Sequence, residues 1–73
     1  MEELLNILKE LYPDVDFAKE DSLVDSGILD SVGMVSIIFE LEDKFGIAVD
    51  MEHIQPENFQ SAETIWKMVE ELR

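Results

Sequence analysis

Three serines in this chain directly follow an aspartate: Asp21-Ser22, Asp25-Ser26 and Asp30-Ser31. Only the last pair stands immediately before a run with helical periodicity. A serine at that place can act as the helix N-cap, or its hydroxyl can carry a covalent group. The other two serines lie in a loop-like stretch, so chemistry at a helix start would depend on Ser31.

Catalysis by the chain's own side chains is not expected. A nucleophilic serine needs a histidine base and an orienting acid, and the single histidine, His53, stands in an acidic loop without a paired motif. We interpret His53 as a solvated loop residue. The sequence has no cysteine, no glycine-rich phosphate loop and no nucleophile elbow. We therefore predict that the protein is not an enzyme.

Metal binding is not expected either. One histidine without cysteine cannot supply a structural zinc site. Asp14 and Asp16 begin the alternate spacing of a calcium-binding loop, but Ala18 breaks that spacing and the glycine of the turn is missing. The sequence thus predicts no metal site.

The charge balance limits the choice of partners. The 73 residues contain 18 acidic and 5 basic side chains, a net charge of −13, and 47% of them are hydrophobic. Such a chain repels nucleic acid and anionic lipid, because phosphate contacts need Lys and Arg. Partners with basic patches are favoured. No signal peptide and no membrane-spanning run is visible, so we expect a cytoplasmic, monomeric domain comprising residues 1–73.

Apolar residues at three- and four-residue spacing predict helices over residues 2–12, 31–45 and 61–72. Pro13 should end the first helix and Gly46 should cap the second.

Between the second and third helices we expect a loop with one short helical turn near 57–59, while Ile54 is assigned to the core. The alternation over 47–49 is too short for a strand. Ser61 is the expected N-cap of the last helix. The predicted fold is all-α: a small four-helix bundle with three main helices and one short helix.

The connection over residues 13–30 is long and holds aspartates and a glycine that suit turns. Apolar residues recur along it, so we expect it to pack across the domain. These residues are Val15, Phe17, Leu23, Val24, Ile28 and Leu29.

The helix predicted over 31–45 has two apolar stripes. One is ordinary core and contains Met34, Ile37, Ile38, Leu41 and Phe45. Val32, Val35 and Phe39 form a second stripe beside Ser31, flanked by Glu42 and Asp43. Either the long connection covers this second stripe, or the stripe is an exposed partner surface with an acidic rim. Gly33 weakens the first helical turn, which makes sense if another group approaches the backbone there.

The run from Val24 to Gly33, VDSGILDSVG, resembles the attachment motif of phosphopantetheine carrier proteins, the acyl, peptidyl and D-alanyl carriers. The order of helices extends this resemblance over nearly the whole chain. It implies that a phosphopantetheinyl transferase attaches 4′-phosphopantetheine from coenzyme A to Ser31. The arm then holds an acyl or aminoacyl group as a thioester, with Asp30 used in docking or by the metal ion of the transferase.

Some residues differ from the pattern of fatty-acid carriers, which usually have Leu where this chain has Val32 and often an acid where it has Ser36. Gly33 and the preceding Ile28-Leu29 look more like D-alanyl and aminoacyl carriers. The expected partners are an activating ligase and a downstream acyltransferase or synthase. These residue differences leave open whether the cargo is fatty acyl, polyketide or aminoacyl. The alternative is an unmodified acidic interaction module that uses the same helix surface.

Overall fold

The computed structural model describes residues 1–73, and all of its regular secondary structure is helical. Three α-helices, α1 (Glu2–Leu11), α2 (Ser31–Phe45) and α3 (Ala62–Leu72), are joined by two 3-10 helices, η1 (Met51–His53) and η2 (Pro56–Phe59). The all-α prediction is confirmed, and no strand forms over 47–49. The short helix expected near 57–59 is η2, a single 3-10 turn, whereas η1 was not predicted.

The ends of the helices follow local chemistry. Pro13 restricts Tyr12 to an extended conformation (φ −135°, ψ 76°), so α1 stops at Leu11. At the end of α2, Gly46 takes the left-handed conformation (φ 65°) and donates its N–H to Glu42 O.

The start of α3 is fixed by a capping box, as the predicted N-cap role of Ser61 requires. Ser61 Oγ accepts from the Thr64 N–H at 3.2 Å, and Thr64 Oγ1 accepts from the Ser61 N–H at 3.1 Å. This reciprocal pair satisfies two N–H groups at the helix start and makes the junction between η2 and α3 a well-defined point in the fold.

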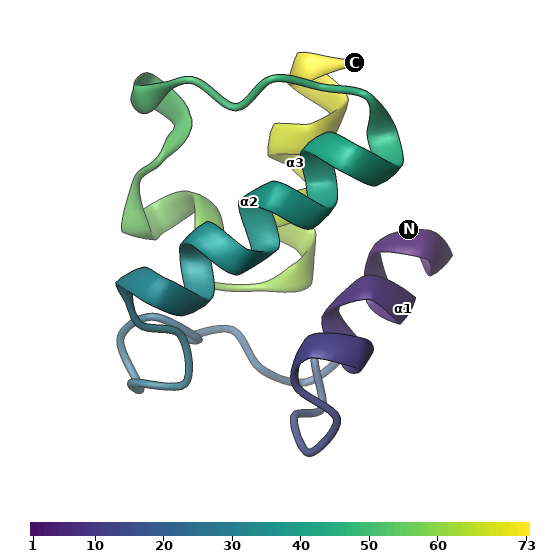
Figure 1. The fold of residues 1–73 in the computed structure, drawn as a ribbon. Helices are drawn as coiled ribbons and strands as arrows, with labels where there is room; N and C mark the ends of the chain where they lie inside the picture. The colour runs from purple at the N-terminus through teal and green to yellow at the C-terminus, as the bar shows by residue number, and fades with distance from the viewer.

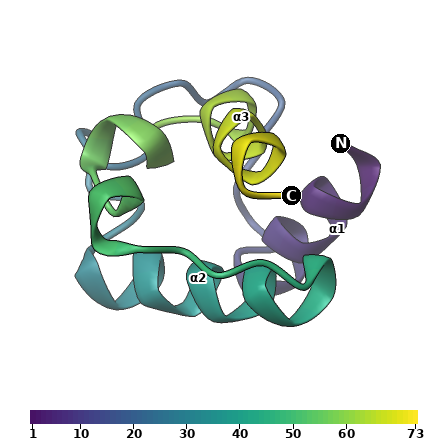
Figure 2. The same cartoon turned by 90° about the horizontal axis from the view of Figure 1, so that it is seen from above.

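The helices surround a single core. Seen from above, α2 lies along one side, α3 stands opposite and is seen nearly end-on, α1 closes one end, and the 3-10 helices close the other (Figure 2). The core consists of 14 buried apolar residues: Leu4, Leu8, Phe17, Leu23, Leu29, Ile37, Ile38, Leu41, Ile47, Phe59, Ala62, Ile65, Met68 and Val69.

The long connection between α1 and α2 packs across the domain, as expected from its apolar residues. It passes beneath α2 in Figure 1 and inserts Phe17, Leu23 and Leu29 into the core. Val15, Val24 and Ile28 are half-buried against it. The connection does not cover the second stripe of α2, whose three apolar side chains stay exposed.

Two predictions for residues 46–60 are wrong. Ile54, which we assigned to the core, caps the end of η1 and keeps 37% of its surface exposed, whereas Phe59 in the following η2 is fully buried. His53 is not a solvated loop residue. Its Nδ1 lies 2.5 Å from Asp50 Oδ1 and its Nε2 lies 3.4 Å from Glu71 Oε2 on α3.

This cluster of His53, Asp50 and Glu71 links η1 to the last turn of α3, and it shifts the pKa values of His53 and Asp50. The hydrogen bond to Asp50, with the charges of Asp50 and Glu71, raises the pKa of His53 above its ordinary value of 6.5. The same bond lowers the pKa of Asp50 below 3.8. The pair of His53 with Asp50 is therefore favoured at mildly acidic pH, where the imidazole is charged.

We expect the stability contributed by His53 to be fully present below pH 6.5 and to be lost as the pH rises through the higher folded-state pKa. Urea unfolding of the wild type and of His53→Gln between about pH 5 and about pH 8 measures this. The stability advantage of the wild type over H53Q should shrink as the pH rises. A difference that stays constant with pH would contradict the assignment.

Candidate functional site

Helix α2 begins at Ser31, as predicted, but Ser31 is not its N-cap. Asp30, not Ser31, is the N-cap: its backbone is extended (φ −102°, ψ −174°) and its Oδ1 accepts from the Gly33 N–H at 2.8 Å. Ser31 is the first residue of the helix. Aspartate and serine are both good caps, and here the carboxylate, which also favours the positive end of the helix, takes the position.

Because Asp30 caps the helix, the Ser31 side chain has no structural task. Ser31 is exposed, and its hydroxyl makes no hydrogen bond within the protein. The other two serines that follow an aspartate do have partners. Ser22 Oγ donates to Asp21 Oδ1 at 3.4 Å and Ser26 Oγ donates to Leu23 O at 3.5 Å, both long contacts.

The backbone beside Ser31 is suited to an anion. The N–H groups of Ser31 and Val32 belong to the first turn of α2, where no intrahelical acceptor exists. The first turns of α1 and α3 carry acidic side chains, whereas that of α2 carries none. A phosphate on the Ser31 oxygen would thus meet free N–H donors and the positive end of the helix dipole.

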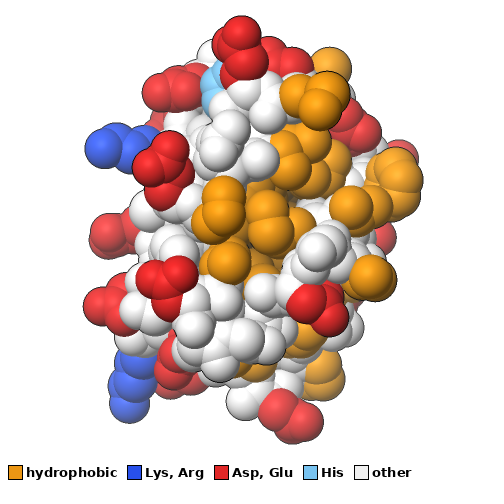
Figure 3. All heavy atoms as spheres, turned by 90° about the vertical axis from the view of Figure 1, so that its left-hand side faces the viewer, with side chains coloured by type: hydrophobic (Ala, Val, Ile, Leu, Met, Phe, Trp, Pro, Cys, Tyr) orange, Lys and Arg blue, Asp and Glu red, His pale blue; other side chains and the backbone are white.

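The second stripe of α2 is exposed, so the long connection does not cover it. Val32, Val35 and Phe39 keep 73%, 46% and 66% of their surface exposed. Hydrophobic side chains gather on the face that carries the start of α2, and carboxylates surround them (Figure 3). Met51 and Ile54 are exposed apolar residues of the 3-10 segment, which lies on the same left-hand side of the molecule in Figure 1.

The three acids predicted to take part in partner recognition have different surroundings. Asp43 is exposed and has no partner in the chain. Glu42 is half-buried, and its Oε2 accepts from the Val49 N–H at 2.9 Å, which fastens the segment after α2 to the helix. Asp30 uses one carboxylate oxygen as the cap. Glu42 and Asp30 therefore have structural tasks that the sequence pattern did not reveal.

Comparison with known proteins identifies the family. Residues 2–71 match the family model described as "Phosphopantetheine attachment site". D-alanyl carrier proteins of Streptococcus suis (strain 05ZYH33) and Streptococcus sanguinis are 40% and 38% identical over 72 residues, which cover 97% of this chain and 91% of each relative. The chain belongs to the phosphopantetheine carrier proteins. No solved structure matches it significantly.

Membership fixes the general role of this carrier protein. Carriers of this family are not enzymes; they hold an acyl or aminoacyl group on 4′-phosphopantetheine and work with a phosphopantetheinyl transferase and ligases. No helix of the structure is sufficiently long and apolar to cross a membrane. No group of three or more metal-binding side chains comes together.

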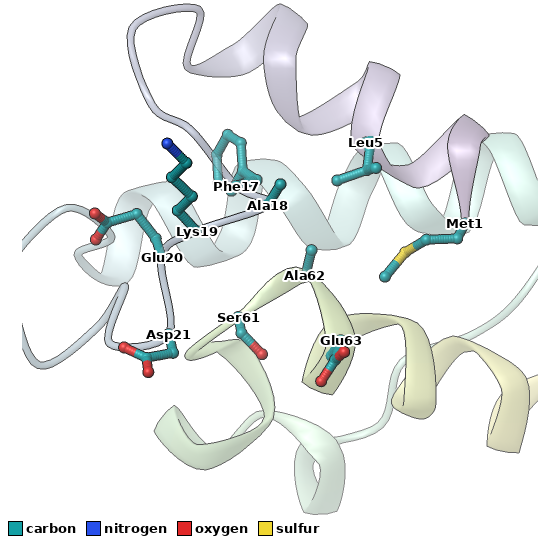
Figure 4. Close-up of a pocket in the computed structure, with 10 residues that line it drawn as sticks. All are labelled: Met1, Leu5, Phe17, Ala18, Lys19, Glu20, Asp21, Ser61, Ala62 and Glu63. Atoms are coloured by element: carbon teal, nitrogen blue, oxygen red, sulfur yellow. The ribbon is translucent and has the colours of Figure 1, made fainter.

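The pockets of the carrier protein lie away from Ser31. One of about 400 Å³ opens between the start of α1, the connection and the start of α3, and is drawn in Figure 4. Its apolar floor includes Leu5, Phe17 and Ala62, and charged residues such as Lys19 line its edge. Ser31 lines none of the pockets, and Phe45, at the far end of α2, is the one residue of the core stripe that lines any of them. The attachment motif is thus on an open surface, and the core is closed.

The packing around α2 explains why position 33 is a glycine. It is buried, and a Cβ there would overlap the hydroxyl of Tyr12, which follows α1. The Tyr12 ring is held edge-on against Phe17, with centroids 6.3 Å apart, and its hydroxyl makes no hydrogen bond. Gly33 suggested that another group approaches the backbone of α2, and Tyr12 is that group. It packs under the helical turn that carries Ser31.

We expect Gly33→Ala to destabilise the protein by about 1 kcal/mol, because the overlap outweighs the helix-propensity gain of alanine. In a Tyr12→Phe background the same change should be neutral or stabilising, since the overlapping atom is gone. A double-mutant cycle by urea unfolding measures the coupling. An equal cost of G33A in both backgrounds would show that Tyr12 is not the reason for the glycine.

Proposed function

We propose that Ser31 is the residue to which 4′-phosphopantetheine is attached and that residues 1–73 act as one carrier domain. One observation carries the assignment: of the three serines that follow an aspartate, only Ser31 has an exposed hydroxyl free of hydrogen bonds. The resemblance of the run from Val24 to Gly33 to the family's attachment motif, within the matched residues 2–71, supports the same residue.

The reaction is a phosphoryl transfer from coenzyme A. Ser31 Oγ attacks the pyrophosphate phosphorus that bears pantetheine; the new O–P bond forms as the P–O bond to 3′,5′-ADP breaks, and the serine proton passes to a base of the transferase. The group supplies a thiol, on which the cargo is held as a thioester. The chain has no cysteine of its own to compete with it.

The surroundings of Ser31 stabilise the product. The free N–H groups of Ser31 and Val32 and the positive end of α2 favour the phosphodiester. Because Asp30 holds the helix start through Gly33, capping and attachment use different side chains. The helix therefore keeps its cap when the serine is modified.

We also propose that the cargo is an amino acid, D-alanine in view of the curated relatives. The packed core supports this, because a long acyl chain needs a hydrophobic tunnel whereas D-alanine does not. A ligase that activates the amino acid and an acyltransferase that consumes it would then be the partners, acting on a cytoplasmic monomer. In this carrier bundle, η2 would take the place of the short fourth helix.

The partner surface in this proposal is the exposed stripe of α2 with its acidic surroundings. Val32, Val35 and Phe39 would form the apolar centre, and Asp30, Glu42 and Asp43 would meet basic groups of the partner. With a net charge of −13, the chain favours fast encounter with basic surfaces.

Incubation with a broad-specificity phosphopantetheinyl transferase, Mg²⁺ and coenzyme A should add one phosphopantetheine, visible by intact mass. Ser31→Ala should gain none, while the matched controls Ser22→Ala and Ser26→Ala should be modified like the wild type. An unmodified wild type, or a modified S31A, would contradict the assignment.

Val35→Asp and Phe39→Asp should each lower kcat/KM for this loading by about tenfold or more, because apolar side chains at the centre of an interface commonly contribute over about 1.4 kcal/mol. Their helical circular dichroism should stay unchanged, since both side chains are exposed. Ala48→Asp, an exposed apolar-to-acid change outside α2, is the control for added charge. Loading at the wild-type rate by V35D and F39D would exclude the stripe from the partner surface.

A further inference from the structure

Three consecutive N–H groups of the connection between α1 and α2 donate hydrogen bonds to one residue, Gln60. The Leu23 N–H donates to the backbone oxygen of Gln60 at 2.9 Å. The Val24 and Asp25 N–H groups donate to its side-chain Oε1 at 3.1 and 3.3 Å. No other hydrogen bond joins residues 12–30 to the part of the chain beyond α2. Gln60 is thus the single polar link between these two regions.

Gln60 is itself well fixed. The residue before it, Phe59, is fully buried, and the residue after it, Ser61, forms the capping box of α3. The acceptor atoms of Gln60 therefore belong to the rigid junction of η2 and α3. These acceptor atoms therefore determine the position of residues 23–25 of the connection.

The position of the loop is passed on to the start of α2. The Leu29 N–H donates to Leu23 O at 2.9 Å, which closes residues 23–29 into a compact loop with a left-handed turn at Gly27. Both leucines are buried in the core. Leu29 is followed directly by the cap Asp30 and by Ser31. The closed loop of residues 23–29 therefore connects Leu23, which is bonded to Gln60, to the start of α2.

We propose that Gln60 is a positioning residue for the modification of Ser31. The inference rests on the proposed function of Ser31. By accepting from Val24 and Asp25, the Gln60 side chain holds the exposed turn of residues 25–27 in one place relative to the serine, so the transferase meets a single arrangement of turn and hydroxyl. The role needs an acceptor oxygen at the end of the side chain, which glutamate also offers and methionine lacks.

The test compares Gln60→Met, Gln60→Glu and a control, Gln55→Met, which changes an exposed glutamine whose side chain makes no hydrogen bond. Loading with the transferase and coenzyme A is measured below each variant's unfolding midpoint. We expect kcat/KM to fall about tenfold for Q60M, since small displacements of a reacting group carry large rate costs. Q60E should recover most of the rate, and Q55M should match the wild type.

Amide hydrogen exchange of Val24 and Asp25 gives a readout that does not depend on loading. Both amides should exchange faster by about tenfold in Q60M and should remain protected in Q60E. If Q60M does not fold, Gln60→Asn replaces it, because the shorter amide withdraws the acceptor without removing its polarity.

Normal loading by a folded Q60M, or equal slowing of Q60M and Q60E, would overturn the positioning role while leaving Ser31 as the attachment residue. Failure of the wild type itself to load would instead refute the proposed function. The two failures are therefore distinguishable in the same experiment.

Discussion

The hydrogen bond from the Gly33 N–H to Asp30 Oδ1 determines the arrangement around Ser31. It begins α2 one residue earlier in the chain than a serine cap would, so Ser31 becomes the first helical residue with a free hydroxyl. Gly33 is the donor of this bond and also the residue against which Tyr12 packs. The start of the helix, its packing against Tyr12 and the free hydroxyl of Ser31 thus depend on Asp30 and Gly33.

The rest of the fold supports this helix from one side only. The core face of α2 is buried among α1, α3 and the long connection, while the opposite stripe is left open. A domain of 73 residues has few apolar side chains to spare, and leaving three exposed on one helix costs stability that burial would have given. A surface of this kind is consistent with partners that cover it during transfer.

Local patterns were enough to predict much of this architecture. The periodicity of the three main helices, Pro13 after α1 and Gly46 after α2 act within a few residues, and each prediction is confirmed. The sequence left open whether Ser31 caps α2, because Asp30 and Ser31 are both good caps, and the backbone conformation of Asp30 shows that the aspartate takes this position. Gly33 indicated that another group lies close to the backbone of α2. The sequence pattern could not identify that group as Tyr12, because the two residues are far apart in the chain.

The features that escaped prediction depend on residues distant in sequence. His53 is paired with Glu71 from α3, so its loop-like surroundings in the sequence were misleading. Gln60 meets Val24 and Asp25 across 35 to 36 residues, and no periodicity reports such a contact. Ile54 is a large apolar residue of the kind found in cores, yet at the end of η1 it keeps 37% of its surface exposed.

The most direct test of the central claim is to locate the modification within the loaded protein. All three Asp-Ser pairs fall between Lys19 and Lys44, hence within one tryptic peptide, so fragmentation of that peptide by tandem mass spectrometry must assign the residue. The account predicts phosphopantetheine on Ser31 alone. Modification of Ser22 or Ser26, whose hydroxyls are engaged in the fold, would contradict it.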